Sequence, residues 1–514
     1  MRFHGEASKD GYDAIVVGSG IGGLTAAALL ARAGREVLVI ERHDRVGGYA
    51  HSFRRGHYRF DSAVHLIGGC EPTAFEGGGL IHNLLTELGV RDRCRFERID
   101  PCYAAVFPEM TATVPGNLDA FIETFSDAYP SNAKGLREFM QECLNVRNEI
   151  RRAAELDNPF NTIQTPDRFP TLIRYRKATL AEVLDDHIDS PRLRAVLGAL
   201  WPYLGLPPSR VSFLYFATML ISYLADGAYY CAGTFQKFAE ALAEAVTRRG
   251  GEILLRSPVR RIRLESNRVC GVLLENGQRV DAPLVISNAD ATQTVEELVG
   301  PEAFSPRYLT RLRGMKPSVS AFVAYLAARL PLSEETSCHE TFLYASLDHE
   351  DAHRSSLAGS PNWLSVTIPT LADPSLAPRG EHLMILTTLL PYGDASRWRS
   401  SKAQMLQRLI DRADACFNGL RQRVVFAEAG SPRTMERYTR NRDGALYGWE
   451  ISPSQVGPGR LDNVTPIAGL HFAGHWTQPG GGIYGVVSSG IQTANSALGV
   501  DRNSKLRGGL RVGW

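Results

Sequence analysis

Three glycines and one glutamate near the start of the chain have the types and the spacing of a site that holds a dinucleotide. Gly18, Gly20 and Gly23 form the pattern G-x-G-x-x-G, and Glu41 follows about 20 residues later. The first glycine permits a tight turn, the second lets backbone approach a pyrophosphate, and the third lets a helix pack closely on a strand. A carboxylate at Glu41 can accept hydrogen bonds from the hydroxyls of a ribose.

These four residues need two strands and a helix to hold them. Residues 14–17 are apolar and β-branched, as a strand buried on both faces requires, and residues 37–40 repeat that pattern. Residues 24–33 have the composition of a helix, which is expected to end at Gly34. Strand, turn, helix, strand and acid come in the order of a dinucleotide-binding βαβ unit, so a turn without a ligand is the less favoured alternative.

A second glycine cluster lies far along the chain, where Gly480, Gly482 and Gly485 repeat the same pattern. A second nucleotide site is not favoured, because no strand with a ribose-binding acid follows. Residues 470–473 are instead expected to add a strand to the first sheet. Gly474 would then let the backbone pass close to the bound dinucleotide, and the helix that follows would point its positive N-terminus at it.

Both clusters resemble segments of the flavin-binding amine oxidase and phytoene desaturase superfamily. The shared motifs are Gly47-Gly48 after the ribose-binding acid, Gly-Leu-x-x-Ala-Gly at 469–474, and Ser-Asn-Ala-Asp at 287–290. The resemblance implies FAD rather than NAD as the resident cofactor. It implies cofactor contacts from Gly18, Gly20, Gly23, Glu41, Arg42, Gly48, Val259, Gly474, His475, Gly482 and Ile483. His475 departs from the pattern, because most members have an acid there, so the ribityl contact must differ.

Two residues are candidates for a catalytic role. Phe60, Asp61 and His65 match the Phe-Asp-x-Gly-x-His pattern of retinol saturases and carotenoid isomerases, with Ala63 in place of the glycine. That loop lies near the flavin in the family, so His65 is a candidate proton donor or orienting group, with a purely structural role as the alternative. Tyr484 would pack on or over the flavin ring. The histidines between positions 43 and 65 lack metal-ligand spacing, so no metal site is expected.

The predicted fold is α/β, with a discontinuous Rossmann-type FAD-binding domain of the amine-oxidase and phytoene-desaturase type and an inserted α+β substrate domain. A chain of 514 residues is too long for one simple core. The FAD-binding domain is expected at 1–70, 231–300 and 430–500. The substrate domain, a helical cap plus a sheet, is expected at 71–230 and 301–429, and 501–514 is expected to be a flexible tail.

The longest nearly apolar run covers residues 211–225. It is too short to span a bilayer, which needs about 20 residues. A buried core helix is one interpretation. The others are a helix that dips into a membrane surface and one wall of an apolar substrate tunnel, lined also by Trp201, Tyr203, Tyr229 and Tyr230.

The expected reaction is hydride transfer at flavin N5 to or from a long, apolar, conjugated polyene or isoprenoid, giving desaturation, saturation or isomerisation. NADPH is expected only as a transient electron donor, because the sequence lacks a second βαβ unit for it. A flavin-dependent cyclase of a polyene natural product, such as a polycyclic tetramate macrolactam, is one alternative. An amine-oxidase-like enzyme is another. The third is a non-catalytic prenyl-lipid-binding protein, as the Rab GDP-dissociation inhibitors of the same fold are.

Net charge, cysteine usage and the N-terminal residues bear on the binding partner and on the cellular compartment. The net charge of +2 argues against a nucleic-acid partner. The partner that the family resemblance implies is a small apolar polyene. The eight cysteines are scattered without C-x-x-C, and residues 1–10 lack the apolar core of a signal peptide, so a cytoplasmic protein with reduced thiols is expected. Peripheral contact with a membrane stays open, and the sequence does not predict the oligomeric state.

Overall fold

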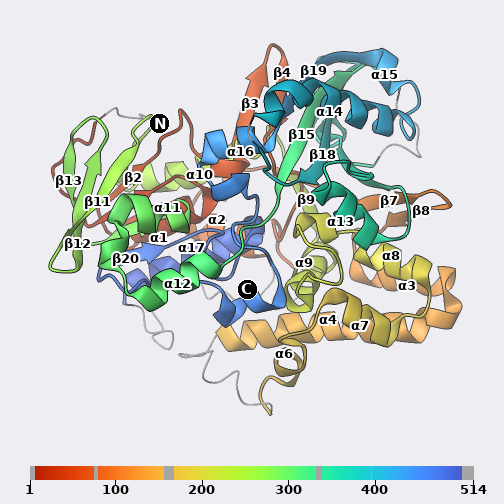
Figure 1. Ribbon diagram of the computed structural model, residues 1–514, viewed down its shortest axis with the longest axis horizontal. Helices are drawn as coiled ribbons and strands as arrows, with labels where there is room; N and C mark the ends of the chain where they lie inside the picture. Colours follow the sequence, from red (N-terminus) through yellow and green to blue (C-terminus); the bar gives the residue numbers. More distant parts are fainter. Residues whose placement is uncertain (1–5, 74–78, 155–166, 332–337, 395, 500–514) are drawn as a thin grey trace.

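A five-stranded parallel sheet gathers segments from three distant parts of the chain (Figure 1). The computed structural model describes residues 6–73, 79–154, 167–331, 338–394 and 396–499, so the tail predicted at 501–514 lies outside the described residues. In spatial order the strands are β10 (Glu252–Leu254), β2 (Val37–Ile40), β1 (Ala14–Val17), β14 (Val285–Ser287) and β20 (Leu470–Phe472). The strand predicted at 470–473 therefore joins the first sheet, beside β14.

Alternate residues of β1 face two different layers, so the whole strand is buried. Val16 packs with α1, whereas Ile15 packs with a three-stranded antiparallel sheet on the other side. The strands of that small sheet are β11 (Val259–Glu265), β12 (Arg268–Leu274) and β13 (Arg279–Asp281). Burial on both faces explains why β1 and β2 are almost entirely aliphatic.

Helix α1 (Ile21–Arg32) packs against α10 (Gln236–Thr247) and α17 (Gly482–Ala497). It begins at Ile21 rather than at the predicted Leu24, because close packing outweighs the low helix propensity of glycine. A Cβ on Gly22 would come within 2.8 Å of the Gly474 Cα, so only glycine fits in that first turn. The predicted stop is confirmed, since Gly34 has a φ of +81° just beyond the helix.

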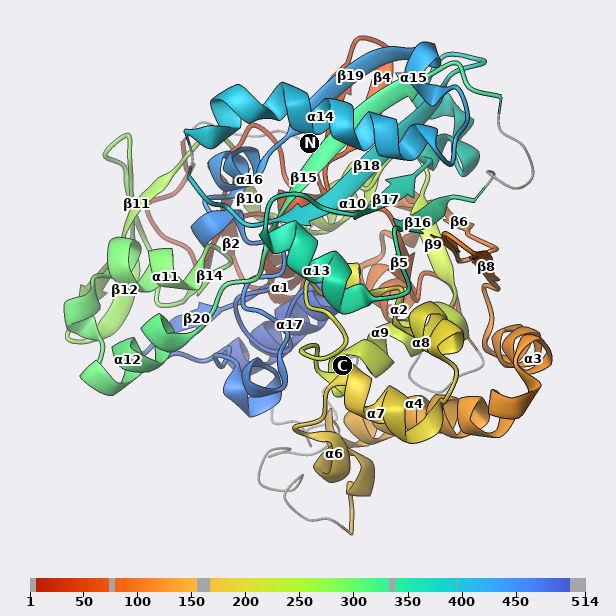
Figure 2. The ribbon, with the colours of Figure 1, turned by 45° about the vertical axis from the view of Figure 1, so that its right-hand side comes forward.

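A seven-stranded sheet forms the centre of the second half of the molecule. Its strands, in spatial order, are β19 (Val424–Gly430), β15 (Ser320–Ala328), β18 (His382–Leu390), β17 (Trp363–Thr367), β16 (Glu340–Tyr344), β7 (Tyr103–Phe107) and β8 (Met110–Val114). All neighbours are antiparallel except β16 and β7. Helix α14 (Arg397–Asp414) covers one face of the sheet, across β15 and β18 in Figure 2.

A layer of helices lies beside this sheet, at the lower right of Figure 1. Its members are α3 (Leu118–Ala128), α4 (Ala133–Ala154), α6 (Pro170–Tyr175), α7 (Leu180–His187), α8 (Pro191–Gly198) and α9 (Phe213–Asp226). Helix α9 is the apolar run of the sequence and packs on α4, where Arg147 and the buried Asp226 form an ion pair at 2.6 Å. Within the described ranges, no helix is both long and apolar enough to cross a membrane.

Shorter elements complete the two halves. They are the hairpin β3 (Ser52–Arg55) and β4 (Tyr58–Asp61), the small sheet of β5 (Ile67–Gly68), β9 (Ala228–Cys231) and β6 (Phe96–Arg98), and the helices α2 (Leu80–Leu88), α11 (Ala291–Gln293), α12 (Pro306–Gly314), α13 (His349–Leu357), α15 (Leu420–Arg423) and α16 (Pro432–Thr439). Where one domain ends and the other begins stays a prediction.

Candidate active site

One cavity of about 550 Å³ brings the two glycine clusters together. The predicted cofactor residues that line it are Gly18, Gly20, Glu41, Arg42, Gly48, Val259, Gly474, His475, Gly482 and Ile483. Gly23 lies behind the wall, where an added Cβ would overlap the carbonyl oxygen of Gly18. The structure thus places these residues around a single space, although their contacts with a cofactor stay a prediction.

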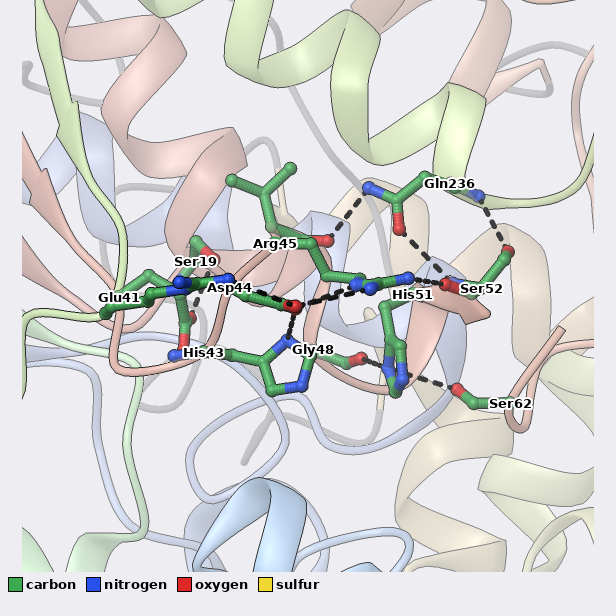
Figure 3. A network of polar contacts seen from close by, with 12 residues as sticks. Ser19, Glu41, His43, Asp44, Arg45, Gly48, His51, Ser52, Ser62 and Gln236 are labelled. Carbon is green, nitrogen blue, oxygen red and sulfur yellow. Dashed lines mark hydrogen bonds and ion pairs between the residues drawn. The ribbon is translucent and has the colours of Figure 1, made fainter. Parts of the chain in front are cut away.

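The carboxylate of Glu41 is held rigidly at one end of the cavity (Figure 3). Its Oε2 accepts hydrogen bonds from the Ser19 amide at 2.8 Å and the Ser19 hydroxyl at 2.7 Å. Its Oε1 accepts from the His43 amide at 2.8 Å. Because a carboxylate offers about four acceptor positions and three of them are used, Glu41 still has one lone pair, on Oε1, for a ribose hydroxyl.

A single asparagine lies among the glycines of both clusters. A Cβ on Gly20 would come within 2.5 Å of Asn288 Nδ2, and a Cβ on Gly474 would come within 2.5 Å of its Oδ1. Gly48 has a φ of +57°, and its Cβ would come within 3.0 Å of the Gly20 Cα. The first obstacle to a side chain at position 20 is therefore Asn288 rather than a bound pyrophosphate.

Four arginines line the cavity, and two of them, Arg42 and Arg440, come from opposite ends of the chain. Arg42 and Arg440 both line the cavity, and burial together with the charge of Arg440 lowers the pKa of Arg42. Arg440 is also ion-paired with Glu297, another residue of the wall, at 3.2 Å. Cations on one wall suit an anionic ligand, and a pyrophosphate is such a group. Arg440 follows α16 and belongs to no motif, so sequence reasoning missed it.

Aromatic side chains form another part of the wall. The rings of His43 and His51 lie 5.3 Å apart, and Tyr438 lies 5.4 Å from His43. Burial lowers the pKa of His51 to about 4, so its ring is uncharged at neutral pH. Its Nδ1 hydrogen-bonds the carbonyl oxygen of Gly48 at 2.7 Å (Figure 3), which fixes the backbone of the second glycine pair.

A fully buried arginine supports the opposite end of the cavity. Arg460 donates to the carbonyl oxygens of Tyr447 and Thr477 at 3.0 Å each, and to that of His475. Tyr447 and His475 line the cavity, so this cation positions two wall residues at once. Burial and the charge of Arg460 lower the pKa of His475 to about 3, which makes its ring a neutral group where the family has an acid.

The two predicted catalytic residues stand just outside the cavity. Val64 lines it, but the His65 side chain does not; His65 is buried, and burial and nearby His339 lower its pKa to about 3. Its Nε2 has no hydrogen-bond partner among the described residues. Tyr484 likewise does not line the cavity, and its pKa rises to about 12 through burial, with a contribution from Asp226. Both catalytic roles stay predictions.

The predicted tunnel residues divide into two kinds. Trp201 is fully buried, with its ring 5.1 Å from that of Trp363, and the Tyr230 hydroxyl donates to Asp61 at 2.5 Å, so both have structural contacts. Helix α9, in contrast, contacts the second glycine cluster, because the Tyr215 hydroxyl donates to the carbonyl oxygen of Gly481 at 2.6 Å. A lining role for these residues stays a prediction.

The family model for flavin-containing amine oxidoreductases matches residues 21–498. The chain belongs to this family. The match spans helix α1, the inserted region and the second glycine cluster, so it supports FAD as the cofactor, and the residues around the cavity fit that group. The predicted fold class is confirmed, and so is the prediction of an FAD-dependent oxidoreductase of the phytoene desaturase, carotenoid isomerase and retinol saturase type.

Named relatives are similar over nearly the whole chain. Prolycopene isomerase 1 from an Oncidium hybrid cultivar is 29% identical, over 96% of this chain and 85% of that protein. The all-trans-retinol 13,14-reductase of Rattus norvegicus is 28% identical, over 90% of this chain and 82% of that protein. Among solved structures, an oxidoreductase from Methanosarcina mazei superposes with a TM-score of 0.64 at 19% identity, over 93% of this chain and 99% of that one, which shows a shared fold.

Proposed function

We propose that this enzyme acts on a long, conjugated, largely apolar polyene and alters its double bonds. The observation that carries the proposal is the position of α9, the most apolar helix segment of the sequence, against the second glycine cluster. The Tyr215 hydroxyl contacts Gly481, and a Cβ on Gly480 or Gly485 would come within 2.9 Å and 2.7 Å of that hydroxyl. The names of the two relatives, a prolycopene isomerase and a retinol reductase, support this class of substrate.

The chain's own residues supply binding and an enclosed site. FAD, when bound, supplies the ability to accept or give a hydride. Glu41, Arg42 and Arg440 would hold its polar half, and the N-terminus of α17 would face the other half. Since His51 and His475 line the cavity, are half-buried and are neutral, this part of the wall is one on which an apolar substrate can displace water without unpairing a charge.

The direction of electron flow is decided by product mass. Purified holoenzyme, with its flavin oxidised or reduced anaerobically by NADPH or dithionite, is incubated with prolycopene, all-trans-retinol and related polyenes. Loss or gain of two hydrogens, or a geometric change at constant mass, is the expected result. Reduction by NADPH would also establish the transient electron donor.

The same experiment distinguishes the other candidates. A product with a new ring would identify a polyene cyclase. Flavin reduced by amines but by no polyene would identify an amine-oxidase-like enzyme and contradict the proposal. Colourless purified protein would indicate a non-catalytic lipid-binding role.

The proton donor can be tested separately. If His65 delivers a proton, His65→Asn lowers turnover at least about hundredfold with flavin still bound. Unchanged turnover would make His65 structural. Tyr484→Phe is the parallel test of the second candidate.

A further inference from the structure

Two polar groups deep in the second half of the molecule face each other without partners. Glu340, the first residue of β16, is fully buried, and Tyr203 lies in the turn before α9. Oε1 of Glu340 and the Tyr203 hydroxyl have no hydrogen-bond partner in the part of the chain that the structure describes. They are neighbours, because a side-chain contact between them contributes to the pKa of both groups, although that contact does not reach the geometry of a hydrogen bond. An unpaired buried polar group costs about 1–3 kcal/mol, so two together point to a ligand.

The Glu340 carboxyl is held in a fixed orientation. The Thr367 hydroxyl donates to its Oε2 at 2.6 Å, which leaves Oε1 as the available oxygen. Since side chains alternate along a strand, Glu340 lies on the same face of β16 as Phe342. The Phe342 ring is 5.3 Å from the ring of Tyr203 and 5.8 Å from that of Tyr103. The available oxygen is therefore surrounded by aromatic rings.

This pair is linked to the cofactor cavity by one more tyrosine. Tyr447 lines the cavity, and its hydroxyl donates to the carbonyl oxygen of Pro202 at 2.9 Å, directly before Tyr203. The ring of Tyr223 on α9 lies 6.3 Å from that of Tyr203. Burial raises the pKa of Tyr223, and Glu340 and Tyr447 both contribute, so Tyr223 lies near both. Aromatic side chains thus lead from the cavity to the unpaired carboxyl.

Building on the proposed function, we propose that Glu340 and Tyr203 bind the polar end of the substrate, which is a polyene with a terminal hydroxyl or carbonyl group. Burial raises the pKa of Glu340 to about 8, so its carboxyl is uncharged at neutral pH. A neutral carboxyl and a phenol can each donate to and accept from one ligand oxygen. A hydrocarbon end would leave both groups unpaired, so the subsite selects against it.

The test compares two ligands that differ by one oxygen. Holoenzyme with oxidised flavin is titrated anaerobically with all-trans-retinol and with the hydrocarbon in which hydrogen replaces the hydroxyl, and Kd is taken from polyene fluorescence. The alcohol is expected to bind at least about tenfold tighter. In Tyr203→Phe and Glu340→Leu this advantage should fall below about threefold, with binding of the hydrocarbon unchanged.

A matched control removes another hydroxyl from the same face of β16. The Tyr344 hydroxyl donates to the carbonyl oxygen of Ala199 at 2.6 Å, so Tyr344→Phe should keep the full advantage of the alcohol. Flavin absorbance checks that each variant is folded. If Glu340→Leu loses its flavin, the affinity difference between alcohol and hydrocarbon in Tyr203→Phe tests the proposal, because that substitution removes only one oxygen atom.

The outcomes separate the two proposals. Equal binding of alcohol and hydrocarbon by the unmodified enzyme would mean that Glu340 and Tyr203 only pair with each other, which overturns this inference and leaves the proposed function intact. An advantage that survives in both variants also overturns it. If neither polyene binds, both proposals are wrong.

Discussion

The cofactor cavity and the Glu340 region differ in whether their buried polar groups are hydrogen-bonded within the protein. On the cavity wall, Glu41 accepts three hydrogen bonds and the donors of Arg460 go to backbone carbonyls. In the Glu340 region, Oε1 and the Tyr203 hydroxyl are unpaired among the described residues. The first set of groups is hydrogen-bonded within the protein and belongs to a rigid cradle, by which we mean the glycine clusters with Glu41 and Arg460. The second set is, in our proposal, left for a ligand. The difference suggests a test, because groups that the protein satisfies should matter for folding and flavin binding, whereas the pair proposed as a subsite should matter for ligand binding.

The largest expected effect comes from the cradle, in Gly23→Ala. The added methyl would overlap the backbone oxygen of Gly18, which cannot move without displacing β1. We expect flavin content below about a tenth of the unmodified value, measured by the ratio of flavin to protein absorbance. Within the protein, Gly20→Ala meets a side-chain atom of Asn288 rather than backbone, so it should keep more flavin. Gly314→Ala has nothing within 4 Å and is the control; full flavin in Gly23→Ala would contradict the packing argument.

The next effect tests whether the buried cation is part of the rigid cradle. Arg460→Leu leaves the carbonyl oxygens of Tyr447, Thr477 and His475 without this donor. We expect the free energy of unfolding to fall by about 3 kcal/mol or more, and flavin to bind more weakly. Arg311→Leu, at a residue that also donates to backbone carbonyls but is exposed, should cost much less in the same denaturant titration. Equal losses would show that burial of Arg460 is irrelevant.

A third effect, spread over several pH units, separates the two regions by pH. The Glu340 carboxyl has a pKa of about 8 when folded and 4.5 when unfolded, so between these values the folded protein holds the extra proton. The contribution of this proton to the free energy of unfolding is therefore complete below pH 4.5 and is lost as pH rises toward 8. Over this window the free energy of unfolding of Glu340→Gln should rise relative to that of the unmodified protein, by at most about 1.4 kcal/mol per pH unit. Asp61→Asn should show the same sign only between pH 3.8 and 6. Parallel pH curves for Glu340→Gln and the unmodified protein would refute the buried neutral carboxyl.

The smallest effect concerns Glu41 itself. Glu41→Gln keeps the shape but turns one acceptor oxygen into a donor that faces the Ser19 or His43 amide. We expect the Kd for FAD to rise about tenfold, through a loss of about 1–2 kcal/mol, measured by fluorescence titration of the apoprotein. Glu36→Gln, which affects an exposed pair with Lys9, should leave the Kd unchanged. A larger loss of FAD binding than in Gly23→Ala would mean that the ribose contact matters more than the packing of α1 on β1.

The sequence predicted the parts of the site that are local. Gly18, Gly20, Gly23 and Glu41 lie within one βαβ unit, where fixed spacing is the geometry, and the second cluster follows the same logic. Asn288 lies within a recognised motif, but its place among the glycines depends on three segments that meet only in the folded chain.

The missed residues have no local signal. Arg440 and Arg460 stand outside any motif, and their roles come from contacts with distant backbone and with Arg42. Glu340 is one acid at the start of an apolar strand, and only its burial and its unpaired oxygen distinguish it from an ordinary edge residue.

Strand β20 has a consequence for how the enzyme is made. It pairs with β14, yet it comes more than 180 residues after it and more than 450 after β1. At a synthesis rate of about 5–20 residues per second, the ribosome needs roughly half a minute to a minute and a half to make the chain as far as this strand. Until then the edge of β14 is unpaired, and Gly474 and α17 are missing from the cradle. Flavin capture is therefore expected to be a late event in biosynthesis, and truncation before residue 470 should yield chains that depend on chaperones and carry no cofactor.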